Sequence, residues 1–268
     1  MKRSRFKIAL VACAAVASVA VLPAAAQAKK TITISGSTSV APLMTKWARA
    51  YARTTSVGFR ILQGGSDVGV ADVSKGAVTI GMSSRDPKAG DPGGLVWNKT
   101  NKDALCVITH KTNTVANMTQ AQVQAVFGGS VRNWNSVSGS NKSGTIDVNV
   151  RTPASGTQDA FKKLFLGSTS VFSGASQKAS NGLIQQTVKS NENAVGYVSL
   201  AFQEGVHTVA YNGTACTLRN AKAGTYEGTR NFWVVTKGAP TGAAAKFIRW
   251  IKTSRTASKI ADSEWVSL

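Results

Sequence analysis

The sequence is poor in acidic side chains, histidine and cysteine. Only 12 Asp and Glu residues stand against 32 Lys and Arg residues, so the formal net charge at pH 7 is +20, and there are two histidines and three cysteines. No Cys/His cluster has the spacing of a zinc site, and no clustered metal-ligating carboxylates occur. The sequence therefore predicts no bound metal, and nothing in it indicates an organic cofactor.

The shortage of histidine also limits the enzymatic alternatives. A serine hydrolase or phosphatase needs a base beside its nucleophile, but only His110 and His207 are available and the G-x-S-x-G pattern is absent. His110 directly follows an apolar stretch, where a structural or hinge role is the simpler interpretation. A serine-dependent hydrolase stays open as an alternative of another class, but the sequence favours a non-enzymatic binding protein.

The positive charge favours anionic partners without naming one. A charge of this size raises the local concentration of anions and speeds their capture. The Lys and Arg residues are scattered, with no basic run longer than two, and no RNP-like segment, zinc-finger spacing or heptad is present. We therefore expect no nucleic-acid partner.

Residues 1–28 predict an export signal. Four basic residues precede an apolar run over 8–22, and Ala26-Gln27-Ala28 forms a small-x-small cleavage site. Two alternatives stay open. One is a lipoprotein, since Cys13 ends a lipobox-like sequence, and the other is an uncleaved membrane anchor, since about 20 apolar residues can span a bilayer. Soluble export ranks first, so the expected location is the periplasm or the outer face of the cytoplasmic membrane or cell wall, with lipid anchoring at Cys13 as the second choice.

Export agrees with the cysteine pattern beyond the signal region. An oxidising compartment permits a disulfide between Cys106 and Cys216. Two buried free thiols are the alternative, and the sequence does not separate the two.

Short β-rich stretches alternate with helical patterns along the rest of the chain. Apolar residues from Pro42 onward recur at helical spacing, and Thr119 and Gln122 have capping-box spacing. Such alternation predicts an α/β architecture with mainly parallel sheets. Strands are expected at 31–35, 57–62, 78–82, 104–109, 145–150, 195–198, 206–211 and 231–236.

Three segments place Gly, Ser and Thr between a strand and the start of a helix. They are GSTSV at 36–40, GGSD at 64–67 and SGT at 155–157. Helix N-termini carry unpaired N–H donors and a partial positive charge, which suit phosphate or sulfate. One such segment is best interpreted as ordinary N-capping, but three in one chain favour an oxyanion site.

Two further features add to this interpretation. Arg151 lies four residues before the SGT segment, at a strand end, and its guanidinium can bind two oxygens of a tetrahedral oxyanion. Ser83-Ser84-Arg85-Asp86 is polar directly after an apolar strand, where ligands of open α/β sheets sit. A solvated arginine and a plain polar turn are the alternatives.

The order of these motifs resembles the PstS family, the phosphate-binding proteins of phosphate ABC importers. The resemblance covers essentially the whole chain after the signal region. It implies a two-lobed type II periplasmic-binding-protein fold with mixed, mainly parallel sheets and a ligand cleft between the lobes. It also implies a monomer that captures inorganic phosphate and delivers it to a membrane ABC permease complex. The matching segments are GSTSVAPL, QGGSDVG, IGMSSRDP, DALCVITHKTN, R-x-x-x-SGT-x-x-F and FWVVTKG.

The resemblance implies a lobe division and a set of ligand contacts. After the signal peptide at 1–28, lobe 1 is expected over 29–110, lobe 2 over 111–205 and a return to lobe 1 over 206–268. The implied phosphate contacts are Thr38, Ser39, Ser66 and Ser84 from one lobe, and Arg151, Ser155, Gly156 and Thr157 from the other.

The chain departs from the family pattern at Asp67 and Ser84. Many relatives have Gly where Asp67 stands, and some have Asp where Ser84 stands. An Asp there can accept a hydrogen bond from protonated phosphate, which sulfate cannot offer, whereas a serine carries no charge to repel sulfate. Asp67, Asp86 or Asp159 are candidates for another acceptor. Sulfate, molybdate or tungstate is therefore the alternative ligand within the same fold.

Overall fold

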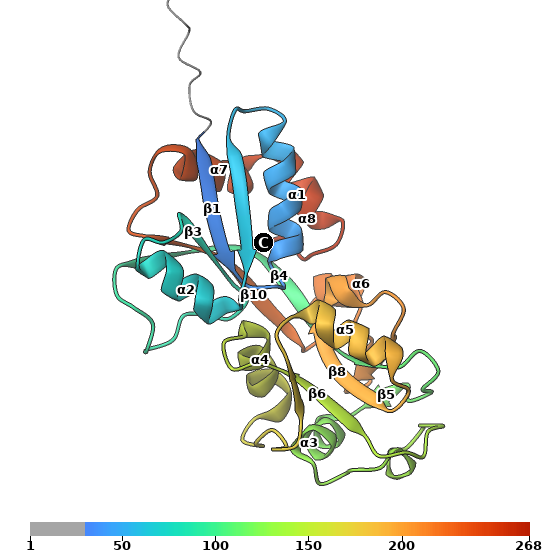
Figure 1. The fold of residues 1–268 in the computed structure, drawn as a ribbon. Coiled ribbons are helices and arrows are strands. Elements are labelled where there is room, and N and C mark those ends of the chain that lie inside the picture. The colour runs from blue at the N-terminus through green and yellow to red at the C-terminus, as the bar shows by residue number, and fades with distance from the viewer. Residues whose placement is uncertain (1–29) are drawn as a thin grey trace, which may run out of the picture.

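A computed structural model describes residues 30–268, so the predicted signal segment and Cys13 lie outside the described residues. The described chain forms two α/β lobes joined by the long strand β4 (Leu95–Thr109) and by the chain segment that leads into β10 (Thr229–Lys237) (Figure 1). Within residues 30–268, the helices are too short or too polar to cross a bilayer.

The first lobe is built on the strand order β2-β1-β3-β10-β4. Pro42 occupies the first turn of its first helix, and Leu43, Trp47 and Tyr51 form the buried face of that helix. The strands are β1 (Thr31–Gly36), β2 (Gly58–Gln63), β3 (Ile80–Ser83), β10 (Thr229–Lys237) and the first part of β4 (Leu95–Thr109); the helices are α1 (Ala41–Ala52), α2 (Ser66–Ser74), α7 (Gly242–Thr253) and α8 (Arg255–Asp262).

The second lobe is built around β8 and β6, which continue the strand order from β4. Thr119 and Gln122 form the predicted capping box of α3. The strands are β5 (Asn117–Met118), β6 (Asp147–Arg151), β7 (Ser176–Lys178), β8 (Ala194–Ser199) and β9 (His207–Tyr211); the helices are α3 (Gln120–Gly128), α4 (Gly156–Phe161) with a π-helical turn (Lys162–Leu166), α5 (Asn181–Ser190) and α6 (Leu218–Ala223), and short 3-10 turns cover Trp134–Ser136 and Leu200–Phe202.

Strand β4 passes from one lobe to the other. Ala104 pairs with Thr229 of β10, whereas the next residue, Leu105, pairs with Ser199 of β8. β4 and β10 run antiparallel to their neighbours, and the other named strand pairs are parallel. The predicted mixed α/β type II architecture is confirmed.

Each lobe has its own core. Trp47, Phe247 and Trp265 belong to a cluster confined to the first lobe. A second cluster extends from Ala104 through β8, β9 and α6 to Tyr226, with Val266 at its edge. Because β9 and α6 pack in this second core, we propose that the chain crosses at about 104 and returns at about 229, rather than at the predicted 110 and 206.

Several elements were not expected from the sequence. The first half of β4 is polar in sequence, since Asn98, Lys99, Asn101 and Lys102 interrupt its apolar residues. Helix α5 has only three apolar residues, Leu183, Ile184 and Val188, so it gives a short pattern. β7 has only three residues, and the apolar residues of α8 recur at helical spacing but are small except for Ile260, so both elements were easy to miss.

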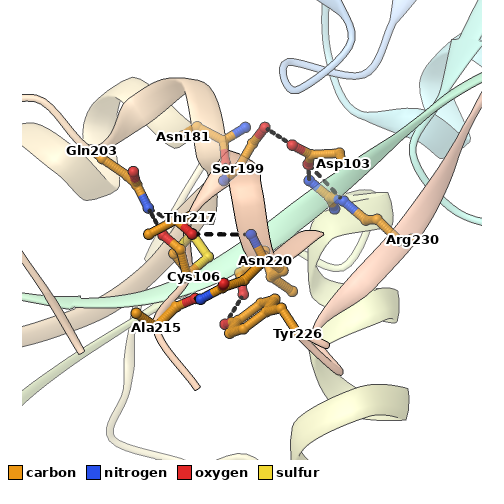
Figure 2. The surroundings of a disulfide bond; sticks show 12 residues. Asp103, Cys106, Asn181, Ser199, Gln203, Ala215, Thr217, Asn220, Tyr226 and Arg230 are labelled. Carbon is orange, nitrogen blue, oxygen red and sulfur yellow. Dashed lines mark hydrogen bonds and ion pairs between the residues drawn. A yellow bond between two sulfur atoms is a disulfide. The ribbon is translucent and has the colours of Figure 1, made fainter. Parts of the chain in front are cut away.

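Cys106 and Cys216 form a disulfide in the second core (Figure 2). Gln203 Nε2 lies 2.9 Å from both Cys106 Sγ and the Cys216 carbonyl oxygen. The bond joins β4 to the segment before α6 across a sequence separation of 110 residues. It therefore constrains a long loop of the unfolded chain.

Removal of this disulfide is expected to destabilise the protein strongly. Replacing both cysteines by alanine should lower the free energy of unfolding by about 2–5 kcal/mol, because the unfolded chain regains the entropy of a long open loop. Urea unfolding of the variant and of the unmodified protein, each with and without reductant, measures the difference. Reductant should destabilise only the unmodified protein, and a variant equal in stability to the oxidised protein would contradict the prediction.

Candidate functional site

The residues predicted to bind an oxyanion meet where the two lobes touch. Thr38 and Ser39 lie between β1 and α1, Ser66 begins α2, and Ser84 follows β3. From the second lobe come Arg151 at the end of β6 and the SGT segment at the start of α4. All of them are buried, and the side chain of greatest exposure is Thr38 at 4%.

Direct contacts join the lobes at this point. Ser39 Oγ lies 2.9 Å from Thr157 Oγ1, and the backbone N–H of Asp67 donates to the Ala154 carbonyl at 3.0 Å. Gly65 has a φ of +104°, and a Cβ there would lie 2.6 Å from the Ala154 oxygen. The structure therefore has its lobes closed on one another around the predicted site.

Arg151 carries a buried charge without a carboxylate partner among residues 30–268. Its Nε donates to the Lys178 carbonyl at 3.1 Å and its Nη2 to the Ala179 carbonyl at 2.8 Å, while Nη1 is buried with no partner. Burial lowers the pKa of the Arg151 guanidinium to about 10, and the charge of Arg230 acts in the same direction. Because the group stays protonated at neutral pH, the site holds a positive charge in need of an anion.

Arg230 is a second buried arginine, which the sequence analysis did not identify. Its Nη2 donates to Asp103 Oδ2 at 2.9 Å and to Ser39 Oγ at 2.8 Å. Nη1 is again buried without a partner. Figure 2 shows the ion pair with Asp103, whose other oxygen accepts from Ser199 Oγ. Burial raises the pKa of the Asp103 carboxyl, while Arg230 and Ser199 act to lower that pKa.

Asn181 is the other residue that the sequence analysis missed. Its Nδ2 donates at 2.9 Å to both Thr38 Oγ1 and Ser39 Oγ, which belong to the opposite lobe. Its Oδ1 accepts from the backbone N–H of Ser199 at 3.1 Å, which fixes the orientation of the amide. The first residue of α5 is thus a bridge between the lobes, and its only sequence signal is the preceding N-cap, Ser180.

These donors decide the direction of the hydrogen bond between Ser39 and Thr157. Ser39 Oγ receives hydrogens from both Asn181 and Arg230, which fill its two acceptor positions. Its own proton must then be donated to Thr157 Oγ1. Ser39 therefore fastens the lobes together, and the proton of the Thr157 hydroxyl is left to donate elsewhere.

An Asn181→Ala variant should bind its oxyanion about tenfold more weakly. The change removes two hydrogen bonds between the lobes, each with a net value of about 0.5–1.5 kcal/mol, and tenfold corresponds to about 1.4 kcal/mol. Calorimetric titration of the variant with the oxyanion measures the loss of affinity. The control is Asn191→Ala at the far end of α5, whose Nδ2 contacts Asp147 outside the site. Equal affinities for both variants would contradict the assigned role.

The three carboxylates considered as acceptors are engaged elsewhere. Asp67 Oδ1 accepts from Arg85 Nε at 2.6 Å, and Asp159 Oδ2 lies 3.4 Å from the same nitrogen. Asp86 accepts from the side chains of Asn231 and Trp233. Arg85 itself is held by Asp67 and by Asp91 at 2.6 Å, so its charge is compensated.

Neither histidine contacts a serine of the site. His110 Nδ1 lies 2.8 Å from Thr112 Oγ1, and His207 Nε2 lies 2.8 Å from the Val115 carbonyl oxygen. Within residues 30–268, His, Cys, Asp and Glu form no group of three that could hold a metal ion. The site is composed of hydroxyl, amide and guanidinium groups, which are hydrogen-bond donors.

A family model, described as a PBP superfamily domain, matches residues 23–255. The chain belongs to the PBP superfamily. Among curated members of similar sequence, the phosphate-binding protein PstS of Bacillus subtilis is 26% identical over 233 residues, which is 85% of this chain and 77% of that protein. The phosphate-binding protein PstS of Borreliella burgdorferi is 25% identical over 256 residues, or 88% and 89% of the two chains.

Solved PBP structures resemble this fold closely. A phosphate ABC transporter substrate-binding protein from Clostridium perfringens, crystallised with bound phosphate, superposes with a TM-score of 0.83 at 31% identity, over 89% of this chain and all of that one. An ABC-type phosphate transport receptor from Vibrio cholerae gives a TM-score of 0.70 at 28% identity, over 88% and 99% of the two chains. The predicted membership of the PstS family within this superfamily is confirmed.

Proposed function

We propose that the protein captures inorganic phosphate outside the cytoplasm and delivers it to the membrane permease of an ABC importer. The observation that carries the proposal is the buried, unpaired guanidinium nitrogen of Arg151, at a lobe junction where the hydroxyl groups of Ser39 and Thr157 meet from the two lobes. The phosphate bound in the similar Clostridium perfringens structure supports the choice of ion.

The charge balance of the site suits a small oxyanion. Arg230 is compensated by Asp103, which leaves the charge of Arg151 to attract the ligand. Burial of a charged group without partners costs tens of kcal/mol in solvation, so the ion needs donors on all sides. We assign the ligand contacts to Thr38, Ser66, Ser84, Arg151, Ser155, Gly156 and Thr157. Ser39 donates to Thr157 instead and links the two lobes.

Closure of the lobes is the proposed response to the ligand. Donors from both lobes reach a single ion only when the lobes approach, so the closed form binds more tightly than an open one. Phosphate then shifts the population toward closure by that difference in affinity. The permease recognises the closed, loaded form, and the proposal includes no chemical step.

The alternatives receive less support. A serine hydrolase needs a base at the nucleophile, and both histidines contact other groups. Sulfate, molybdate or tungstate would meet the same donors, since Asp67, Asp86 and Asp159 are committed to other partners. The test must therefore compare these ions directly.

Calorimetric titration of the exported chain with phosphate, sulfate and molybdate tests the proposal. We expect one phosphate per chain and no measurable heat from the other ions at the same concentration. Phosphate at a hundredfold excess over its Kd should also stabilise the fold by about 2.7 kcal/mol, with no turnover of a chromogenic phosphate ester. Preference for another ion, or binding that falls steeply with salt, would overturn the assignment.

We also propose that the protein is a monomer located outside the cytoplasm. Light scattering should give the mass of one chain with and without phosphate. Fractionation of expressing cells should place the protein in the periplasm or at the outer face of the membrane or wall. A Cys13→Ala variant separates soluble export from lipid anchoring, because only an anchored protein would be released by the change.

A further inference from the structure

A groove at the lobe junction lies beside the buried site and faces solvent. Its volume is about 540 Å³, and its lining includes Ser84 and Arg230, two residues of the buried site. One wall comes from β4, the start of β10 and the segment after β3, and the other from α4 and its π-helical turn. The groove therefore borders the oxyanion site with walls from both lobes.

Both acidic side chains that line this groove, Asp86 and Asp159, already have polar partners. Asp159 Oδ2 lies 3.4 Å from Arg85 Nε and 3.5 Å from Lys88 Nζ. Asp86 Oδ1 accepts hydrogen bonds from Asn231 at 2.8 Å and from Trp233 at 3.0 Å. Neither of these two carboxylates forms an ion pair with Lys99, Lys102 or Lys163.

Three lysines of the groove have no ion-pair partner among residues 30–268. Lys99 and Lys102 lie on β4 in one wall, and Lys163 lies in the turn after α4 in the other. Lys102 and Lys163 are exposed, and Lys99 is partly exposed. An anion in the groove would therefore meet ammonium groups from both lobes.

We propose that Lys99, Lys102 and Lys163 form a second, exposed anion site that collects small inorganic oxyanions and passes them to the buried one. The inference rests on the proposed phosphate function and adds the route of capture. Concave surfaces lined by one sign of charge raise association rates by about 10- to 1000-fold. Hydrated ammonium groups on flexible chains hold an anion loosely, which suits capture, whereas the buried donors suit retention.

Collection of anions in the groove is useful because the oxyanion site between the lobes is buried. Ser39, Ser66 and Ser84 are fully buried, so an ion reaches them only after the lobes separate. The capture rate depends on how often an anion is nearby while the lobes are open. A groove that concentrates anions beside Ser84 and Arg230 raises that frequency without changing the contacts of the bound state.

Stopped-flow tryptophan fluorescence with inorganic phosphate tests the inference on the full exported chain. The variant combines Lys99→Gln, Lys102→Gln and Lys163→Gln. The matched control combines Lys75→Gln, Lys246→Gln and Lys259→Gln, three exposed lysines that do not line the groove. Both triple variants lose three charges, so only the position of the lost charge differs. A Lys→Arg triple variant at the groove positions keeps the charge and checks for local structural damage.

At low salt, the groove variant should associate with phosphate at least about threefold more slowly than the control variant, with an unchanged dissociation rate. The difference should vanish at about 1 M salt, where charges are screened within about 3 Å, and the arginine variant should keep the original rate. Equal rates for the groove and control variants, or a difference that persists at high salt, would overturn the inference. A protein that binds no phosphate at equilibrium would instead overturn the proposed function, so the two failures are distinct.

Discussion

An Arg151→Met variant is expected to bind phosphate at least about a hundredfold more weakly, with little loss of stability in phosphate-free buffer. Loss of one partner of a buried, hydrogen-bonded charge pair costs about 2–5 kcal/mol in binding, and a hundredfold corresponds to about 2.7 kcal/mol. Among residues 30–268 the guanidinium has no carboxylate partner, so its burial is a cost until an anion arrives. Methionine fills much of the volume and removes that cost.

Arg230→Met is the matched comparison, because Arg230 is also buried but is paired with Asp103. Its replacement leaves a buried carboxylate alone, which should lower the free energy of unfolding by about 3–5 kcal/mol. Calorimetry with phosphate and urea unfolding without phosphate measure the two quantities for each variant. Equal destabilisation by the two changes would contradict the view that Arg151 is held unpaired for its ligand.

A Gly156→Ala variant is expected to lose at least about a hundredfold in phosphate affinity while each lobe stays folded. A Cβ at this position would lie 2.3 Å from Ser66 Oγ and 3.0 Å from the backbone nitrogen of Arg85, both in the opposite lobe. Alanine is a good residue for a helix start, so α4 itself tolerates the change. The clash arises only on closure, and it should hold the lobes apart.

Gly182→Ala provides the control, since Gly182 lies near the start of α5 and a Cβ there would meet nothing nearer than Ser180 Oγ at 3.8 Å. Small-angle scattering with and without phosphate reports closure, and calorimetry reports affinity. We expect the Gly156→Ala variant to remain expanded when phosphate is added, whereas the Gly182→Ala variant closes. A closed Gly156→Ala variant with normal affinity would show that the packing at this point does not control closure.

Much of the site could be predicted from the sequence because its parts are local. Ser155 caps α4 through its own side chain, which accepts from the N–H groups of Thr157 and Gln158. Strand, cap and helix follow one another within a few residues, so spacing alone places these donors at a helix start. Thr38 and Ser66 likewise lie between a strand and a helix start, although neither side chain caps its helix, and Ser84 follows β3 with no helix after it.

The residues that sequence analysis missed act across long separations. Arg230 meets Asp103 from 127 positions away, and Asn181 meets Ser39 from 142 positions away. In the sequence, Asp103 and Arg230 look like ordinary charged residues at the edges of apolar strands. Nothing in the spacing of the chain indicates that β4 and β10 pair with these two residues opposite each other.

The sequence by itself determined the strand-to-helix corners, their donor groups and the family, because capping and helix-end electrostatics depend on residues a few positions apart. Only the tertiary structure decided which arginine is neutralised and which stays free for a ligand. It also decided that Ser39 fastens the lobes rather than standing free to donate. Those outcomes depend on which strands become neighbours, and that is set by the packing of two cores rather than by any local pattern.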